Sequence, residues 1–407
     1  MVYILYTRIM SVVLAALYKI NNYLIRRKIK MLNVSVVGIG NAGSQVAALA
    51  AEKLSVPVLA INSSERDLQT IPTNVPKVLI GDTKGAGKER SAAKRFLKDA
   101  IMDIISNTEY KEIFNTDVLF IVSSTGGGTG SGASVLLSSI MSEAYSRVKV
   151  ITIGILPTLK EALSTQLNTI EYMQELYNTL DDATYMLYDN DKLSKLPSTT
   201  MMQSINESIV NDIDVIRGTY QISTKFSSID EKDMSNIIST KGRIAIASLR
   251  DIKEKDLDET TFEDMLIHQF KTNAHCEIQR DKIVHRTGVI SNLSDRLNER
   301  FDSHIPEVQE FIGSPVEEFE HTAINVDRHI PNNVFLIVAG LTQVNDRIRK
   351  INDRIDEINE KQKQIEEESE LGGIDFAEMS KKIERKDSDK MSGENVDLMS
   401  IFNKFDV

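Results

Sequence analysis

From residue 31 onward, short apolar, β-branched runs alternate with longer stretches whose apolar residues recur every three or four positions. The short runs predict buried strands, and the longer periodic stretches predict helices between them. Strand candidates in the first half are residues 32–37, 56–61, 77–80, 117–122, 148–155 and 183–188. Strands that alternate with helices predict an α/β fold with a parallel sheet, whose ligands bind where the strands' carboxyl ends point.

The second half of the pattern starts with a long helix. Its buried stripe is predicted from residues spaced three or four apart, Ile205, Ile209, Ile213, Ile216 and Tyr220, and it is expected to end near Phe226. From Lys241 the strand-like runs GRIAIASL, KIVHRTGVI and NNVFLIVAG, separated by helix-like stretches, predict a second, smaller α/β domain. Starting at Val344, isoleucines at 348, 351, 355, 358 and 365 predict an amphipathic helix. Packing on its own body or on an adjacent subunit is favoured over a free coiled coil.

Both ends of the chain depart from this pattern. The first thirty residues join an apolar stretch to a basic end, but Arg8 and Lys19 interrupt it. Its longest clean run, residues 9–18, is about half of the roughly 20 residues that a membrane span needs. An extra helix, or translation upstream of a true start at Met31, is therefore favoured over a membrane anchor. Beyond residue 373 a charged, flexible tail ends in an apolar helical face that predicts docking on a partner, formed by Leu398, Ile401, Phe402 and Phe405.

Length, charge and cysteine content narrow the functional classes. A chain of 407 residues suggests two domains plus appendages. A net charge of −11 argues against direct nucleic-acid binding, which relies on clustered Lys and Arg. The single cysteine, Cys276, is compatible with a reducing cytoplasm and is a poor candidate nucleophile. The six histidines lack metal-ligand spacing, so no metal-binding side chains are predicted.

Two glycine-rich loops follow predicted strands. GIGNAGSQ places Gly38, Gly40 and Gly43 at the G-x-G-x-x-G spacing that lets backbone approach a phosphate at a helix N-terminus. That spacing alone also fits a NAD-dependent oxidoreductase, with Glu65 as the ribose-binding acid. TGGGTGSG follows the fourth strand and opens another helix with five glycines in seven residues. Glycine loses more conformational entropy on folding than other residues, and a simple turn does not need five of them. A second polyphosphate-binding loop is therefore predicted.

GGGTGSG after a strand is the tubulin signature, and over residues 32–341 the chain resembles the tubulin/FtsZ superfamily, most of all the TubZ-type partition proteins of plasmids and phages. The resemblance implies a Rossmann-like GTPase domain, a long central helix and a second α/β domain, followed by a C-terminal helix and a flexible tail. The implied boundaries are an extension at 1–30, a GTP-binding domain at 31–200, the central helix at 201–227, the second domain with its catalytic loop at 228–341, the C-terminal helix at 342–370 and the tail at 371–407. GTP or GDP with Mg²⁺ are the implied ligands.

The same resemblance assigns nucleotide-binding residues loop by loop. GDTKGAGKER is the implied γ-phosphate loop rather than a Walker A motif, because Glu89 stands where Ser or Thr would hold magnesium. Glu161 is implied at the ribose, and Asn190 and Asn206 at the guanine edge, where an amide offers donors and an acceptor. The phosphate loops are implied to contribute Gly38, Gly40, Asn41, Ala42, Gly43, Gln45, Asn62, Gly85, Ala86, Gly87, Gly126, Gly127, Gly128, Thr129, Gly130 and Ser131.

Two acidic residues beyond the long helix are the implied catalytic pair. Asp230 and Asp233 match the spacing of the superfamily's catalytic loop, which completes the site of a neighbouring subunit. Carboxylates can orient an attacking water, directly or through Mg²⁺. Ser228 departs from the usual Asn of FtsZ proteins, which puts the detailed water geometry in question.

The implied function is a cytoplasmic GTPase that assembles head to tail with itself and hydrolyses GTP when assembled. The tail is expected to engage a DNA-binding adaptor, so that filaments partition plasmid or phage DNA. An FtsZ-like role in cell division and a NAD-dependent oxidoreductase remain as alternatives.

Overall fold

The computed structural model describes residues 31–368 apart from short gaps at 83–84, 180–182, 222–223, 225, 279–282 and 327–328. The predicted tail-docking residues Leu398, Ile401, Phe402 and Phe405, and the predicted N-terminal extension, lie outside this part. None of the helices in the described part combines the length and the apolar character that a membrane span requires.

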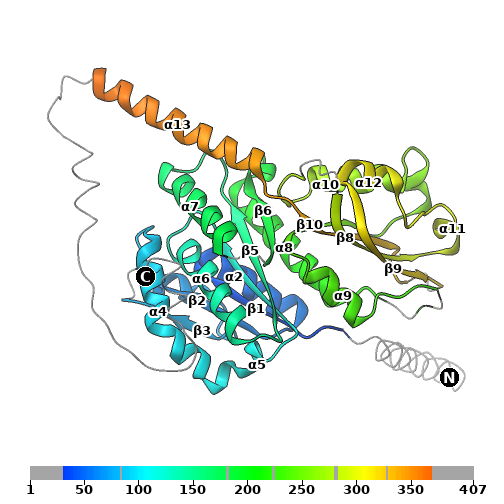
Figure 1. Cartoon of the computed structure of the whole chain (residues 1–407), viewed down its shortest axis with the longest axis horizontal. Helices are drawn as coiled ribbons and strands as arrows, with labels where there is room; N and C mark the ends of the chain where they lie inside the picture. The colour runs from blue at the N-terminus through cyan, green and yellow to red at the C-terminus, as the bar shows by residue number, and fades with distance from the viewer. Residues whose placement is uncertain are drawn as a thin grey trace, which may run out of the picture.

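One sheet of ten strands runs through the molecule in the order β3-β2-β1-β4-β5-β6-β7-β10-β8-β9 (Figure 1). Its parallel half confirms the six predicted strands as β1 (Val34–Ile39), β2 (Val58–Asn62), β3 (Lys77–Leu79), β4 (Val118–Ser124), β5 (Lys149–Leu156) and β6 (Thr184–Asp189). Except for β3, each strand ends one or two residues later than predicted. The reason is that residues near the loops still pair, as Ile39 does with Ser123.

The second half of the sheet comprises β7 (Gly242–Leu249), β8 (Ile283–Leu293), β9 (Ser314–Ile324) and β10 (Asn333–Leu341). β10 is antiparallel to β7 and β8, and β7 joins the first half through three parallel residue pairs with β6. Strand β9 was not predicted, because Glu317, Glu318 and Glu320 interrupt its apolar pattern. It forms because it lies at the edge of the sheet and pairs in parallel with β8.

Helices cover both faces of the sheet. α2 (Gly40–Leu54), α8 (Ser198–Arg217) and α9 (Glu231–Ile238) share one hydrophobic core with the strands. On the opposite face pack α4 (Arg90–Ser106), α6 (Thr129–Ala144), α7 (Leu163–Thr179) and the start of α13 (Asn345–Glu368). The other helices are α3 (Glu65–Gln69), α5 (Lys111–Phe114), α10 (Phe262–Thr272), α11 (Asp295–Asn298) and α12 (Pro306–Ile312), the last three against β7, β8 and β10. These layers confirm the predicted fold class.

The long helix α8 is shorter at its C-terminus than predicted. It ends at Arg217 because Gly218 adopts the left-handed conformation (φ 87°) and donates back to Val215 O at 3.0 Å. Tyr220, expected on the helical stripe, lies past this end and packs against the Phe335 ring, 4.5 Å between centroids.

Replacing Gly218 by alanine tests this helix end. We expect a loss of about 1 kcal/mol, because a left-handed L-residue is strained by roughly that much. An added Cβ meets only Gln221 at an ordinary 3.6 Å, so no steric term adds to it. Thermal unfolding measures the loss, and Gly218→Asn should lose less, since Asn tolerates this conformation. Equal stability of the alanine variant and the wild type would contradict the assignment.

The C-terminal helix α13 starts on the body and then leaves it. Ile351 and Ile355 are buried, Ile348 and Ile358 are half-buried, and residues 359–364 are exposed. Figure 1 shows its far half, in orange, projecting past α7. The first half therefore packs on the chain's own body.

Candidate functional site

Two helix N-termini meet at the carboxyl rim of the parallel strands. Neither α2 nor α6 has a side-chain cap or an acidic residue in its first turn. They lie side by side, because a Cβ on Gly40 would stand 3.0 Å from Gly130 N, and one on Gly130 would stand 2.9 Å from Ile39 O. Uncapped N–H groups and the positive ends of two helix dipoles favour an anion at this point.

The glycine run before α6 also has packing reasons, which the sequence interpretation underestimated. A Cβ on Gly126 would stand 2.3 Å from the Thr165 side chain, and one on Gly132 would stand 2.4 Å from Arg90 O. The run is thus not explained by polyphosphate binding alone. It lets α4 and α7 approach loop four closely; loops one to six are the segments that directly follow β1 to β6, and loop four is residues 125–128.

Hydrogen bonds connect several of the predicted loops along this rim. Loops two and four meet through the hydroxyls of Ser63 and Thr129, 2.6 Å apart, and loop three joins them through Gly85 N, which donates to Ser63 O at 3.0 Å. Loop four pairs with the end of β5 through Thr125 N and Ile155 O at 3.0 Å. The structure therefore brings together the loops that the sequence assigned to phosphates.

Several assigned side chains are engaged inside the chain. Asn62, 2% exposed, accepts from Ser64 N at 3.2 Å and so shapes loop two. The Ser131 hydroxyl donates to Gly127 O and accepts from Arg90 Nε at 3.2 Å. The side chains of Asn62 and Ser131 therefore stabilise the conformation of their loops.

Lys88 and Arg90 connect the third loop to its neighbours and were not among the predicted site residues. Lys88 has a left-handed backbone (φ 65°), and its Nζ donates to Thr165 Oγ1 at 3.0 Å. The Arg90 side chain, 4% exposed, bonds Glu171 at 3.0 Å and also pairs with Glu175. The cations were visible in GAGKER, but neither the backbone conformation nor these partners can be inferred from sequence spacing.

The other side of the rim carries the residues assigned to sugar and base. Glu161 Oε1 accepts from Thr158 N at 2.9 Å, which closes the fifth loop. Asn190 opens the turn that follows β6, and Asn206 lies on the part-exposed face of α8. Asn41, at the start of α2, is exposed. These amides are accessible, as base or phosphate contacts require.

The predicted catalytic pair lies away from this rim. Asp230 Oδ1 accepts from Asp233 N at 2.8 Å, and Asp233 Oδ2 accepts from Asp230 N at 3.1 Å, so together they form the capping box of α9. They follow the far end of α8, whose 20 residues span about 30 Å. Figure 1 shows α9 just below the labelled part of α8. Within one chain, the two acids do not meet the candidate site.

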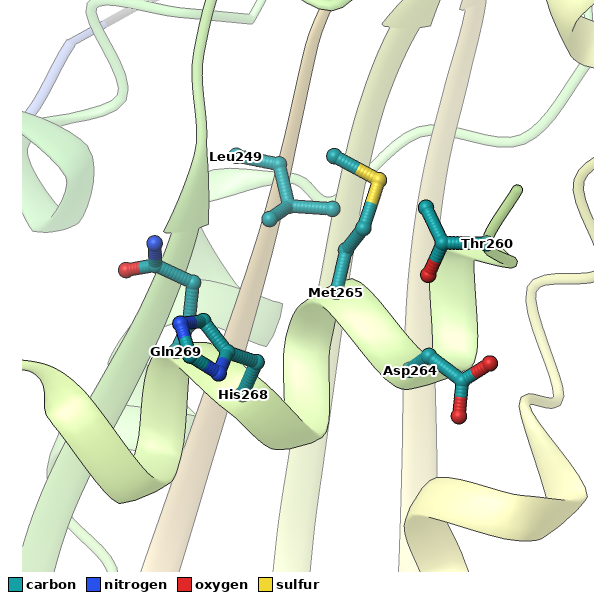
Figure 2. A pocket seen from close by; sticks show the side chains of 6 residues that line it. All are labelled: Leu249, Thr260, Asp264, Met265, His268 and Gln269. Atoms are coloured by element: carbon teal, nitrogen blue, oxygen red, sulfur yellow. The ribbon is translucent and has the colours of Figure 1, made fainter. Parts of the chain in front are cut away.

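Two other candidates in the described part of the chain, Cys276 and a pocket beside α10, do not form a second site. Cys276 is fully buried, and burial raises the pKa of its thiol, which keeps it protonated. A pocket of about 370 Å³ lies beside α10 (Figure 2). Figure 2 shows Thr260 and Asp264 at one end, His268 and Gln269 at the other, and apolar side chains between them. Since its polar groups do not converge, the rim remains the candidate site.

In a comparison with known protein families, the part of the chain that contains the rim matches a family model. Residues 33–197 match the family model described as "Tubulin/FtsZ family, GTPase domain". The curated tubulin-like protein CetZ of Pyrococcus horikoshii is 26% identical over 222 residues, which is 52% of this chain and 59% of the relative. CetZ1 of Haloferax volcanii is 26% identical over 231 residues, 52% and 58% of the two chains. The chain thus spans less than two thirds of the length of these relatives.

Solved structures extend the likeness to the whole fold. TubZ of Clostridium botulinum phage c-st superposes with a TM-score of 0.65 at 17% identity, covering 81% of this chain and 99% of that one. CetZ1 of Haloferax volcanii, a GDP-bound monomer, gives 0.62 at 20% identity over 81% and 100%. A GTPγS-form protofilament of Bacillus thuringiensis serovar israelensis TubZ gives 0.64 at 18% identity over 82% and 94%.

These findings define an α/β chain with a tubulin/FtsZ-type GTPase domain. The candidate site lies in the loops at the carboxyl ends of that domain's strands. Residues 33–197 match the GTPase domain of the tubulin/FtsZ family, and the fold of the chain is similar to those of TubZ and CetZ. The match confirms the resemblance inferred from GGGTGSG and favours a GTPase domain over the NAD-dependent alternative.

Proposed function

We propose that this chain is a GTP-dependent, filament-forming GTPase. The observation that carries the proposal is the pair of uncapped helix N-termini at Gly40 and Thr129, which lie side by side next to hydrogen-bonded loops. Such an arrangement suits a polyphosphate. The matched family domain and the nucleotide-bound structures of related proteins support GTP as its source.

The arrangement of the rim suggests how a nucleotide would lie. The triphosphate would lie over the start of α2 and α6, held by backbone N–H groups of loops one to four. The sugar would face Glu161, and the base would face Asn190 and Asn206. Mg²⁺ bound with the phosphates would neutralise their charge, and we assign no side chain of this chain to it.

Hydrolysis is proposed to require a second copy. Asp230 is exposed, and the pair follows the C-terminal end of α8, eleven helical residues or about 16 Å beyond Asn206. Head-to-tail stacking would carry these carboxylates to the rim of the next subunit, where they can orient the attacking water. Protofilament structures of related TubZ and CetZ proteins support this mode of assembly.

The cellular role is proposed to be partition or positioning of plasmid or phage DNA from the cytoplasm. The TubZ likeness supports it, and the net charge of −11 favours an adaptor over direct DNA contact. The adaptor would bind the tail residues 398–405. A division role of the FtsZ kind is the second candidate, and the matched domain of the tubulin/FtsZ family supports it.

Light scattering and phosphate release, measured over a range of protein concentrations, test the proposal. With GTP we expect filaments and a turnover per subunit that rises steeply once they form, because each site is completed by a neighbour. With NAD the scattering should stay flat. Filaments that form without nucleotide would contradict the nucleotide dependence. Turnover per subunit that stays constant while filaments grow would contradict the shared site.

A further inference from the structure

The C-terminal helix α13 is anchored to the body by a buried ion pair. Arg347, in its first turn, donates from Nε to Asp189 Oδ2 at 2.8 Å and from Nη2 to Asp189 Oδ1 at 3.1 Å. The side chains are 5% and 6% exposed. Nη2 also donates to Pro157 O at 2.6 Å. A bidentate pair of this kind fixes orientation as well as distance.

These contacts fall beside the two loops assigned to the nucleoside. Asp189 is the last residue of β6 and directly precedes Asn190, the residue assigned to the base. Pro157 directly follows β5 and starts the loop that carries Glu161, the residue assigned to the sugar. One guanidinium group therefore connects the starts of both loops.

A second arginine, two helical turns after Arg347, also links α13 to these two loops. Arg354 Nε donates to Leu159 O at 3.1 Å, and Leu159 N donates to Asp191 Oδ1 at 3.0 Å. Between the arginines, Ile351 is buried in the core. Loops five and six and the first three turns of α13 thus form one hydrogen-bonded unit.

The electrostatics favour a positional role for the ion pair. Burial raises the pKa of the Asp189 carboxyl, and the Arg347 guanidinium opposes that shift. Nη1 of Arg347 is buried with no hydrogen-bond partner in the described part of the chain. Because removing two charges from water can cost more than their attraction returns, such a pair is weak evidence for stability. What it does secure is the geometry of the loops it bonds.

We propose that Arg347 is a positioning residue for the guanosine half of the nucleotide, and that binding of this half is coupled to docking of α13. The inference rests on the proposed function. The phosphate half is built from α2 and α6, whereas the contacts of Arg347 and Arg354 go to loops five and six. The coupling free energy is the same in both directions. If docked α13 strengthens guanosine binding, then bound guanosine stabilises the docking of α13 by the same free energy.

Binding of GTP and of inorganic tripolyphosphate by isothermal calorimetry separates the two halves. In Arg347→Met we expect GTP affinity to fall roughly tenfold or more, since small misplacements of binding groups have effects of this size. Tripolyphosphate affinity should stay within about twofold. The control is Arg349→Met, because Arg349 is 70% exposed and its ion pair is with Asp346 on the same helix. An equal loss for both ligands, or an unchanged GTP affinity, overturns the proposal.

Two further measurements cover the case in which Arg347→Met does not fold. Arg347→Lys keeps the charge but loses the forked geometry, and the same split between ligands is expected at smaller size. Hydrogen exchange of the wild-type chain should slow across residues 345–356 with GTP more than with tripolyphosphate. Equal protection by both ligands overturns the coupling. A wild-type chain that binds no GTP refutes the proposed function, whereas GTP binding without the split refutes this inference alone.

Discussion

A chain carrying Asp230→Ser together with Asp233→Gln is expected to assemble with GTP and to hydrolyse it roughly 10²–10⁴-fold more slowly, the usual contribution of a positioned acid–base group. Simple alanine variants would mix two effects, because the two carboxylates also cap α9. Ser and Gln at these positions restore a capping box without carboxylates. Lost hydrolysis can then be separated from a lost helix start.

Phosphate release and sedimentation, measured on the same samples, check this result. Filaments should persist longer than those of the wild type, since GTP would remain at the subunit contacts. Asp264→Gln is the matched control, because Asp264 occupies the same position of the Thr261-capped helix α10 and has no assigned catalytic role. Normal phosphate release from filaments of the double variant would remove the pair from the mechanism.

The second large effect is expected from Gly40→Ala. Gly40 has a φ of 72°, and an added Cβ would stand 3.0 Å from Gly130 N, which is backbone that cannot turn away. The first turns of α2 and α6 must then separate. A contact this tight requires a shift of a few tenths of an ångström, so we expect GTP affinity to fall by roughly tenfold, less than the roughly 100-fold of a 1 Å misplacement. Stability should fall by about 1–3 kcal/mol from strain and overpacking.

Fluorescent-nucleotide titration and thermal unfolding measure the two losses separately. Gly218→Ala is the control, because its φ of 87° is similar but its Cβ has room and it lies at the far end of α8. That variant should lose stability and keep its nucleotide affinity. If Gly40→Ala bound GTP as the wild type does, the two helix N-termini could not be the phosphate site.

The parallel strands were predictable because they are continuous apolar runs, which carry their own signal at any position in a sheet. The end of α8 was predicted nine residues too late, since the apolar stripe continues to Tyr220 and outweighed Gly218 in the sequence pattern. Strand β9 was missed for the opposite reason. One face of an edge strand is solvated, and its glutamates hid the alternation.

Contacts between side chains far apart in the sequence could not be predicted from the spacing of residues. The pair of Arg347 and Asp189 joins residues 158 positions apart, and both have ordinary neighbours in the sequence. Asp230 and Asp233 show the converse difficulty. Their spacing fits a helix cap as well as a catalytic loop, and the structure shows the cap, so the catalytic role stays a prediction.

The charged edge strand has a consequence for a chain that is proposed to polymerise. An eleven-residue edge strand is a template for unregulated strand addition, the route to insoluble aggregates. Near its C-terminal end the segment before α9 covers β9, where Thr322 N donates to Ser227 O at 3.2 Å. Along the rest, Glu318 and Glu320 would repel an identical strand, whereas Glu317 is ion-paired with Arg286. At high local concentration, these carboxylates would keep self-association from becoming amyloid-like.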